Sequence, residues 1–143
     1  MAAAPFTLGA ALFLVLQQPE AEQPNALSLV DVSSWHIVEV DGQKTPLTGD
    51  LFRDDRYAID IYPGGFVGYG GCNRFSGTYV RTGDTVTIKP AGGTRSRCGQ
   101  AIMALEQRLF EILRDPLQVR FPSSGVMILS GPRGRVQLKR SDE

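Results

Sequence analysis

The sequence has little of the residue types from which most catalytic sites are built. It contains one histidine and two cysteines in 143 residues. These are too few ligands for a structural zinc site, which takes four. It also lacks a phosphate-loop lysine and a Gly-x-Ser-x-Gly nucleophile turn. We therefore expect no metal, no cofactor and no enzymatic activity.

The chain also lacks a net charge, because fifteen Lys and Arg balance fifteen Asp and Glu. This balance gives no reason to expect a nucleic-acid partner or an anionic membrane surface. The charges are unevenly distributed: residues 1–73 hold three basic and nine acidic residues, and residues 74–143 hold twelve and six. One interpretation is a basic face on the folded domain. Distant segments interleave in a β-rich fold, however, so the alternative is that the basic residues are scattered over the surface.

No apolar run is long enough for a membrane-spanning helix, which needs about 20 residues. The charge-free run from Pro5 to Leu16 instead resembles the hydrophobic region of a secretory signal. We predict a signal peptide over 1–21, a linker over 22–30, one domain over 31–140 and a short tail over 141–143. A buried N-terminal segment is the alternative. Because no cysteine precedes Cys72, lipid anchoring is excluded, and the predicted location is periplasmic or secreted.

Most of the predicted domain alternates apolar and polar residues, the period of half-buried strands. Turn residues separate the segments, for example Pro63-Gly64-Gly65 and Gly83-Asp84, and Lys44 to Asp55 suits a loop. The strands are expected over residues 35–40, 57–61, 66–69, 73–80, 85–89, 117–121, 126–129 and 135–139. Residues 122–125 are expected to form a turn.

One helix is expected from Gly99 to Arg114, because this stretch lacks proline and Asp115-Pro116 ends it. The predicted fold class is α+β: a mostly antiparallel, curved or barrel-like sheet of about seven short strands, with one helix covering a face.

Glu106 falls inside the apolar arc of this helix. A buried carboxylate needs a partner or a proton. The candidate partners are Arg74, Asn73, the backbone N–H groups near Gly70-Gly71, and a tyrosine hydroxyl. We interpret Glu106 as a buried polar brace and count Arg74 as part of it, while the choice between Arg74 and the other candidate partners stays open. The functional alternative is a polar group at the floor of a binding cavity.

Cys72 and Cys98 form an even pair in a chain that the N-terminal run marks for export, which favours one disulfide. Two buried thiols are the alternative, and catalysis or metal binding by Cys72 with His36 is a third.

Trp35 is expected in the core, and His36 on the opposite strand face with Val38 and Val40. Arg95 and Arg97 lie just before the helix, where they either bind an anion at its N-terminus or are simply solvated.

The stretch Gly70-Gly71-Cys72-Asn73-Arg74-Phe75-Ser76-Gly77-Thr78-Tyr79 resembles the signature of the META domain, the family of the bacterial heat-shock protein HslJ. The structural motif consists of Gly71, Asn73, Phe75, Gly77 and Tyr79. Trp35, Gly42, Thr94, Glu106 and Leu113 agree in order and spacing. Ser96 and Arg97 depart from the usual Met and Ala. The resemblance implies a small envelope or secreted domain linked to stress or antibiotic tolerance, without a known enzymatic reaction.

Two functional hypotheses follow. The first is a non-enzymatic envelope domain that binds a protein partner or an apolar ligand. For the apolar ligand we expect a cavity between helix and sheet, lined by Phe110, Met103 and Ile59. The second is an enzyme or redox protein that uses Cys72 with Glu106 or His36, and it requires a free thiol. The sequence predicts no oligomeric state.

Overall fold

A computed structural model of the chain describes residue 3, residues 32–46 and residues 56–141. The predicted signal peptide and linker lie outside these residues, apart from Ala3. Most of the predicted loop between Lys44 and Asp55 also lies outside them, as do the last two residues of the predicted tail. Those predictions stay untested.

The described residues form nine strands and one helix. Their bounds in chain order are β1 Ser33–Val40, β2 Gln43–Lys44, β3 Tyr57–Tyr62, β4 Gly65–Gly70, β5 Arg74–Thr82, β6 Thr85–Gly93, α1 Gln100–Leu113, β7 Leu117–Ser123, β8 Val126–Gly131 and β9 Gly134–Arg140. Each predicted strand and the predicted helix is present, with shifted ends.

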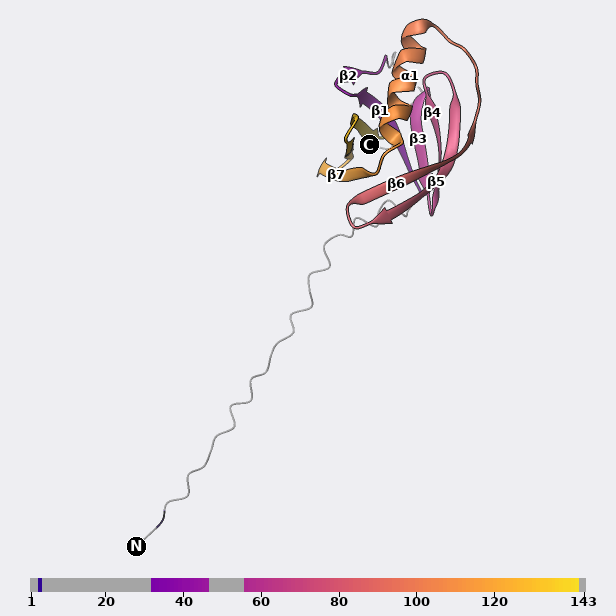
Figure 1. Cartoon of the computed structure of the whole chain (residues 1–143). Coiled ribbons are helices and arrows are strands. Elements are labelled where there is room, and N and C mark those ends of the chain that lie inside the picture. The colour runs from indigo at the N-terminus through magenta and orange to yellow at the C-terminus, as the bar shows by residue number, and fades with distance from the viewer. Residues whose placement is uncertain (1–2, 4–31, 47–55, 142–143) are drawn as a thin grey trace.

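The strands form one antiparallel sheet that closes on itself (Figure 1). From β3 to β9 each strand pairs with the next, and β1 pairs with both β3 and β9. The sheet is therefore a closed barrel of eight strands, with the two-residue β2 attached to the end of β1. The α+β prediction is confirmed, but seven strands was too low a number.

Two local predictions were wrong. Lys44 belongs to β2 rather than to a loop, because it pairs with Glu39 across the turn at Asp41-Gly42. Pro122 and Ser123 belong to β7 rather than to a turn, because β7 carries an irregularity between Arg120 and Ser123 that lets pairing resume at Ser123. Proline is tolerated at such a position because the irregular site needs no backbone N–H group to donate to the neighbouring strand.

The barrel interior holds the core, to which the inward residues of all eight strands contribute. Trp35 is 4 % exposed, as predicted, and Ile37 is fully buried beside it. Val40 was expected on the opposite face but is buried in the core. A bulge in β1 between Ile37 and Glu39 explains this, since an extra residue reverses the alternation of side chains.

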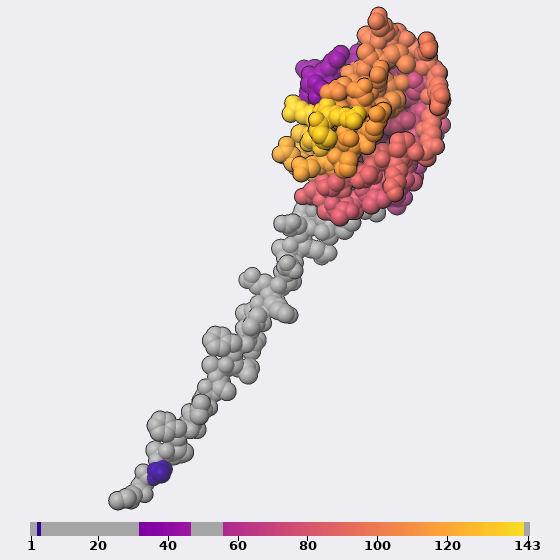
Figure 2. All heavy atoms as spheres, in the orientation of Figure 1, coloured from indigo at the N-terminus to yellow at the C-terminus, as the bar shows by residue number. Residues whose placement is uncertain are grey.

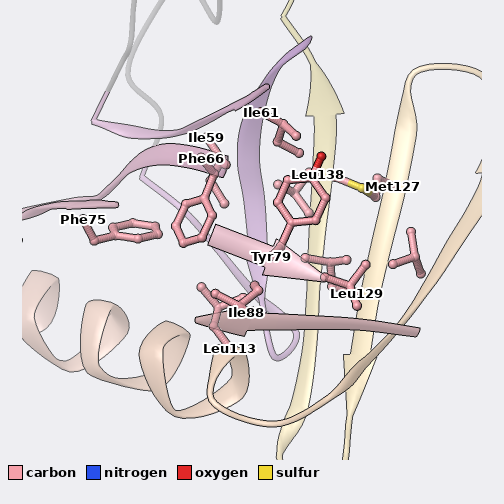
Figure 3. Close-up of a pocket in the computed structure, with 12 residues that line it drawn as sticks. Ile59, Ile61, Phe66, Phe75, Tyr79, Ile88, Leu113, Met127, Leu129 and Leu138 are labelled. Carbon is pink, nitrogen blue, oxygen red and sulfur yellow. The ribbon is translucent and has the colours of Figure 1, made fainter. Parts of the chain in front are cut away.

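Helix α1 packs across the barrel against β1, β4 and β9 (Figure 1). Its apolar side buries Leu105, Leu109, Ile112 and Leu113. The strands β6 and β7 pair only at their first residues, where Thr85 lies opposite Gln118 and Val86 opposite Leu117. Beyond Val86 this edge of β6 has no strand partner, and Leu113 of α1 and Ile88 of β6 line the same cavity (Figure 3).

Gly77→Ala should destabilise the barrel by about 2 kcal/mol. A Cβ at Gly77 would clash with the backbone carbonyl oxygen of Lys89 on β6 and lie 3.0 Å from the Phe66 ring. Gly92→Ala is the matched control on β6, because a Cβ there meets nothing within 4 Å. Urea unfolding followed by Trp35 fluorescence would measure both variants. Equal midpoints for the two variants would contradict this packing account.

Candidate functional site

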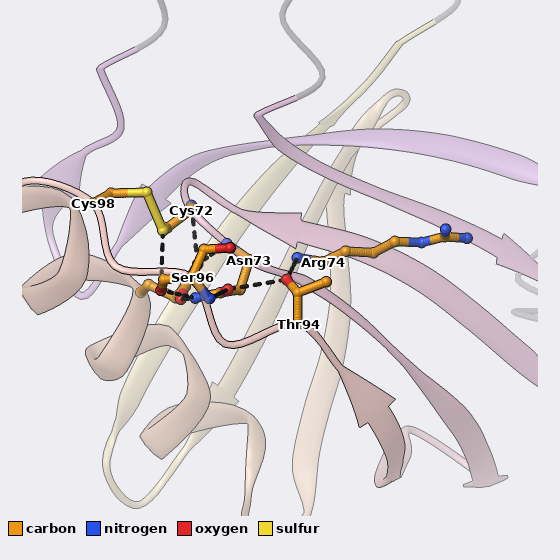
Figure 4. Close-up of a disulfide and its surroundings, with 7 residues drawn as sticks. Cys72, Asn73, Arg74, Thr94, Ser96 and Cys98 are labelled. Carbon is orange, nitrogen blue, oxygen red and sulfur yellow. Dashed lines mark hydrogen bonds between the residues drawn. A yellow bond between two sulfur atoms is a disulfide. The ribbon is translucent and has the colours of Figure 1, made fainter.

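The glycine-rich motif lies at the β4–β5 turn, where a disulfide ties it to the helix. Cys72 and Cys98 are bonded, with their Cα atoms 5.9 Å apart. Cys98 lies two residues before α1, so the bond joins the turn to the loop that enters the helix (Figure 4). The predicted pairing is thus present. The thiol hypothesis for Cys72 requires a free thiolate, which a disulfide sulfur does not provide.

Glu106 is the buried group that organises this turn. Its side chain is 2 % exposed, and both carboxylate oxygens accept hydrogen bonds. The backbone N–H groups of Cys72 and Asn73 donate to Oε2 at 3.0 and 2.7 Å. The Asn73 side-chain amide donates to Oε1 at 2.6 Å. One helical side chain therefore holds the backbone and a side chain of the turn together.

Asn73 extends the network from the turn to the loop before the helix. Its Oδ1 accepts from the Ser96 N–H at 2.6 Å and from the Thr94 hydroxyl at 2.9 Å. Its Nδ2 donates to the Ser96 carbonyl at 3.1 Å as well as to Glu106. All four hydrogen-bonding positions of the amide are thereby used, and its orientation follows from the Ser96 N–H, which cannot accept. Asn73 is itself 6 % exposed.

Arg74 was predicted to belong to the buried brace with Glu106, and this is wrong for its side chain. Its side chain is exposed and extends away from the cluster (Figure 4). Only its backbone N–H takes part, donating to the Thr94 hydroxyl at 3.0 Å. Asn73, also a candidate, and the N–H groups of Cys72 and Asn73 hold the carboxylate instead. Because Asn73 faces inward, the next residue along an extended strand faces outward.

The other motif residues have packing roles. Gly71 has φ +107°, and a Cβ there would lie 2.6 Å from the Tyr57 ring, so only glycine fits the turn. The Phe75 ring lies between Phe66 and Phe110, at centroid distances of 5.9 and 5.1 Å. The Tyr79 hydroxyl donates to the Tyr62 carbonyl. None of these residues presents a reactive group.

Two apolar spaces adjoin this cluster. The first is a cavity of about 50 Å³ inside the barrel, whose lining includes Ile59 and Tyr79 (Figure 3). The second is a groove of about 300 Å³ between β5–β6 and the end of α1. They share four lining residues: Phe66, Phe75, Ile88 and Leu113. We call the second space the α1–β6 groove.

Asn73 and Thr94 line the α1–β6 groove, so the polar network forms part of its wall. Phe110 lines the groove, as expected for an apolar site. The outer surface of α1 lies between the C-terminal strands and the β5–β6 strands (Figure 2). Met103 was expected in the lining but lines neither space. It lies about two helical turns before Phe110, near the disulfide end of α1.

The remaining sequence candidates lie apart from this site. His36 is 4 % exposed on the outward face of β1, opposite Trp35. It lines a separate hollow with Asp60 and Tyr69. Arg95 and Arg97 are exposed in the loop before α1. Sequence reasoning missed the role of Ser96, which was noted only as a departure from the family pattern. Its two contacts use backbone atoms, which no side-chain pattern reveals.

In the part of the chain that the structure describes, no three His, Cys, Asp or Glu side chains gather as metal ligands. Across the same residues, no helix is both long enough and apolar enough to cross a membrane. What the described site offers chemically is a rigid, cross-linked turn beside an apolar groove.

Comparisons with known proteins agree with this architecture. No curated protein matches the chain. An NMR structure of a protein from Burkholderia xenovorans superposes with a TM-score of 0.62 at 21 % identity, covering 88 % of this chain and 93 % of the other. Another NMR structure gives a TM-score of 0.60 at 22 % identity, covering 77 % and 90 %. The META domain family model matches residues 28–143, and the chain therefore belongs to the META domain (HslJ-like) family.

Proposed function

We propose that this chain is a non-enzymatic binding domain of the cell envelope or of a secreted protein, which takes an apolar ligand into the α1–β6 groove. The stress-tolerance role is carried over from the family resemblance. Export is supported by the disulfide, since such bonds persist in oxidising compartments. It is also supported by the apolar run at Pro5–Leu16.

The observation that carries the proposal is the apolar wall that the groove shares with the barrel interior. Phe66, Phe75, Ile88 and Leu113 line both the groove and the inner cavity, so the groove is built on side chains of the core. At about 300 Å³ the groove is at the lower end of the ~300–1000 Å³ typical of small-molecule sites. Such sites combine an apolar lining with a few fixed polar groups, here Asn73 and Thr94.

The architecture also explains why the groove stays open. Strand β6 pairs with β5 along its length, but on its other edge its pairing with β7 ends at Val86. Side chains of α1 therefore form the opposite wall of the groove. The turn and the loop before the helix are held at one end by the disulfide and by Asn73. A groove supported in this way is preformed, which lowers the ordering cost of binding.

Nile red, a neutral dye whose emission depends on solvent polarity, tests this proposal. We expect saturable binding at one site per chain. Gly92→Leu should weaken it at least tenfold, because Gly92 lines the groove and its Cβ direction is open, so a larger side chain occupies ligand space without distorting the strand.

Gly99→Leu is the matched control. Gly99 also has open space around its Cβ direction and a negative φ of −56°, but it does not line the groove. This variant should bind the dye as the wild type does. Absence of saturable binding to the folded wild type would overturn the proposed function, and equal weakening by both variants would overturn the location.

A further inference from the structure

The rim of the α1–β6 groove carries charge of one sign. Arg74 and Arg114 are the charged residues among its described lining residues, and no carboxylate lines it. Both arginines are exposed, and neither forms an ion pair among the residues described. An apolar groove with guanidinium groups at its edge is complementary to a molecule with an apolar body and an anionic end.

These two arginines differ from the paired arginines at and beyond the end of α1. Arg108, on the same helix, contacts Asp41 at 2.7 Å and Glu111 at 3.2 Å, and these carboxylates raise the pKa of its guanidinium. Arg133 is paired with Asp115 at 3.2 Å. The acidic residues near the end of α1 are thus engaged elsewhere, which leaves Arg114 available to an external anion.

The surroundings of the groove add to this positive field. From residue 61 to residue 106, which covers β4, β5, β6 and the entry to α1, the chain has five basic residues and two acidic residues. Asp84 lies 4.0 Å from Arg81 at the far hairpin, and the buried Glu106 carboxylate accepts three hydrogen bonds behind Asn73. Charges of one sign beside a low-dielectric groove raise the local concentration of oppositely charged ligands.

We propose that the ligand of the α1–β6 groove is a free single-chain amphiphile with an anionic head, of the alkyl carboxylate class. Its chain lies on Phe75, Phe110 and Leu113, and its head lies at the rim, within reach of Arg114 and Arg74. Guanidinium groups bind carboxylates through paired N–H donors, whereas an alcohol of the same length receives no charge-assisted bond. This inference rests on the proposed function, because it specifies the ligand of the same groove.

Displacement of Nile red by three ligands with the same ten-carbon chain tests the inference. These are decanoate, decan-1-ol and decyltrimethylammonium, each below its aggregation threshold, at pH 7.5 and low salt. We expect decanoate to compete about tenfold better than the alcohol, and the cationic amphiphile to compete worst. The advantage of decanoate should shrink in 0.5 M NaCl, where exposed charges are screened within a few ångströms.

Arg74→Gln combined with Arg114→Gln should bring decanoate to the affinity of the alcohol and leave the alcohol unchanged. Arg120→Gln is the matched control, because Arg120 is exposed on β7 and does not line the groove. Its expected effect on the ratio of decanoate to alcohol affinity is less than twofold.

The failures of the two proposals are distinguishable. Equal competition by decanoate and decanol, with Gly92→Leu weakening both, overturns the anionic head and supports the apolar groove. If neither compound displaces the dye and the dye itself does not saturate, the proposed function fails. Sedimentation with phosphatidylglycerol vesicles that decanoate does not reverse would overturn the free amphiphile in favour of a membrane surface.

Discussion

Glu106→Ala is expected to lower the free energy of unfolding by about 3–5 kcal/mol, among the largest effects of any single substitution in this domain. The reason is the number of donors that depend on this carboxylate. Two backbone N–H groups and the Asn73 amide lose their acceptor together. Each buried donor left without a partner costs about 1–3 kcal/mol.

Two more conservative substitutions separate hydrogen bonding from packing. In Glu106→Gln one acceptor oxygen becomes an NH₂ group that faces the Asn73 Nδ2, itself a donor. Asn73 cannot turn its amide over, because Ser96 N–H requires its oxygen. We therefore expect Glu106→Gln to cost about 1–3 kcal/mol, less than Glu106→Ala.

Asn73→Asp replaces the amide donor that faces Glu106 with a second carboxylate oxygen. A second carboxylate oxygen would face Oε1 of Glu106 across the 2.6 Å that the amide now bridges. Two such carboxylates repel unless they share a proton. Because the folded variant then binds that proton more tightly than the unfolded chain, its stability should rise as the pH falls from 7 towards 4, which is the direction linkage requires.

Urea unfolding at pH 7 and pH 4.5, followed by the fluorescence of the buried Trp35, measures these differences. The expected order of stability at pH 7 is wild type, Glu106→Gln, then Glu106→Ala. A Glu106→Ala variant as stable as the wild type would contradict the role of Glu106 as a brace. An Asn73→Asp variant that gains no stability relative to the wild type on acidification would contradict the contact with Glu106.

Loss of the Cys72–Cys98 bond is expected to cost about 3–4 kcal/mol. The two cysteines are 26 positions apart, and the bond closes a loop that contains β5, β6 and the entry to α1. Closing such a loop restricts the unfolded chain more than the folded one, which already holds these residues in place. The stabilisation is a large share of the ~5–15 kcal/mol typical of a small domain.

The experiment compares wild type and Cys72→Ala/Cys98→Ala, each with and without reductant. Reduction of the wild type should bring its urea midpoint to that of the double variant, and reductant should leave the double variant unchanged. The double variant should still fold at 25 °C, since the hydrogen bonds from Ser96 to Asn73 do not depend on the sulfurs. A loss below 1 kcal/mol would contradict this account of the bond.

The two effects should also be coupled. The disulfide and the Asn73 network both hold the turn against the loop before α1, and residues that share contacts do not add independently. In the double cysteine variant, Glu106→Ala should therefore cost a different amount than in the wild type, by at least ~0.5 kcal/mol. Exact additivity would show that the two restraints act on separate regions.

Much of this fold could be predicted because its signals are local. Alternation along a strand and turn residues at its ends depend on neighbours in the sequence, and the eight long strands were found on those grounds. Their number was miscounted and their ends were shifted. At β1 the alternation failed beyond Ile37, since a bulge is set by pairing with β9, a strand about a hundred residues away.

The site was predictable to the same degree. Helical periodicity placed Glu106 among apolar side chains, and its burial at 2 % follows from that pattern. Its partner was not predictable, because Asn73 and Arg74 are adjacent and the direction in which the chain leaves the turn decides which of them faces the helix. Gly71, with φ +107°, sets that direction.

The amino-acid sequence by itself determined the strands, the helix, the family motif and the presence of a buried acid. Only the tertiary structure decided the closure of the barrel through β1 and β9, the short overlap of β6 with β7, and the groove that this overlap leaves beside α1. The physical reason is range: propensity and periodicity act over a few residues, whereas closure and grooves depend on which distant surfaces bury each other best.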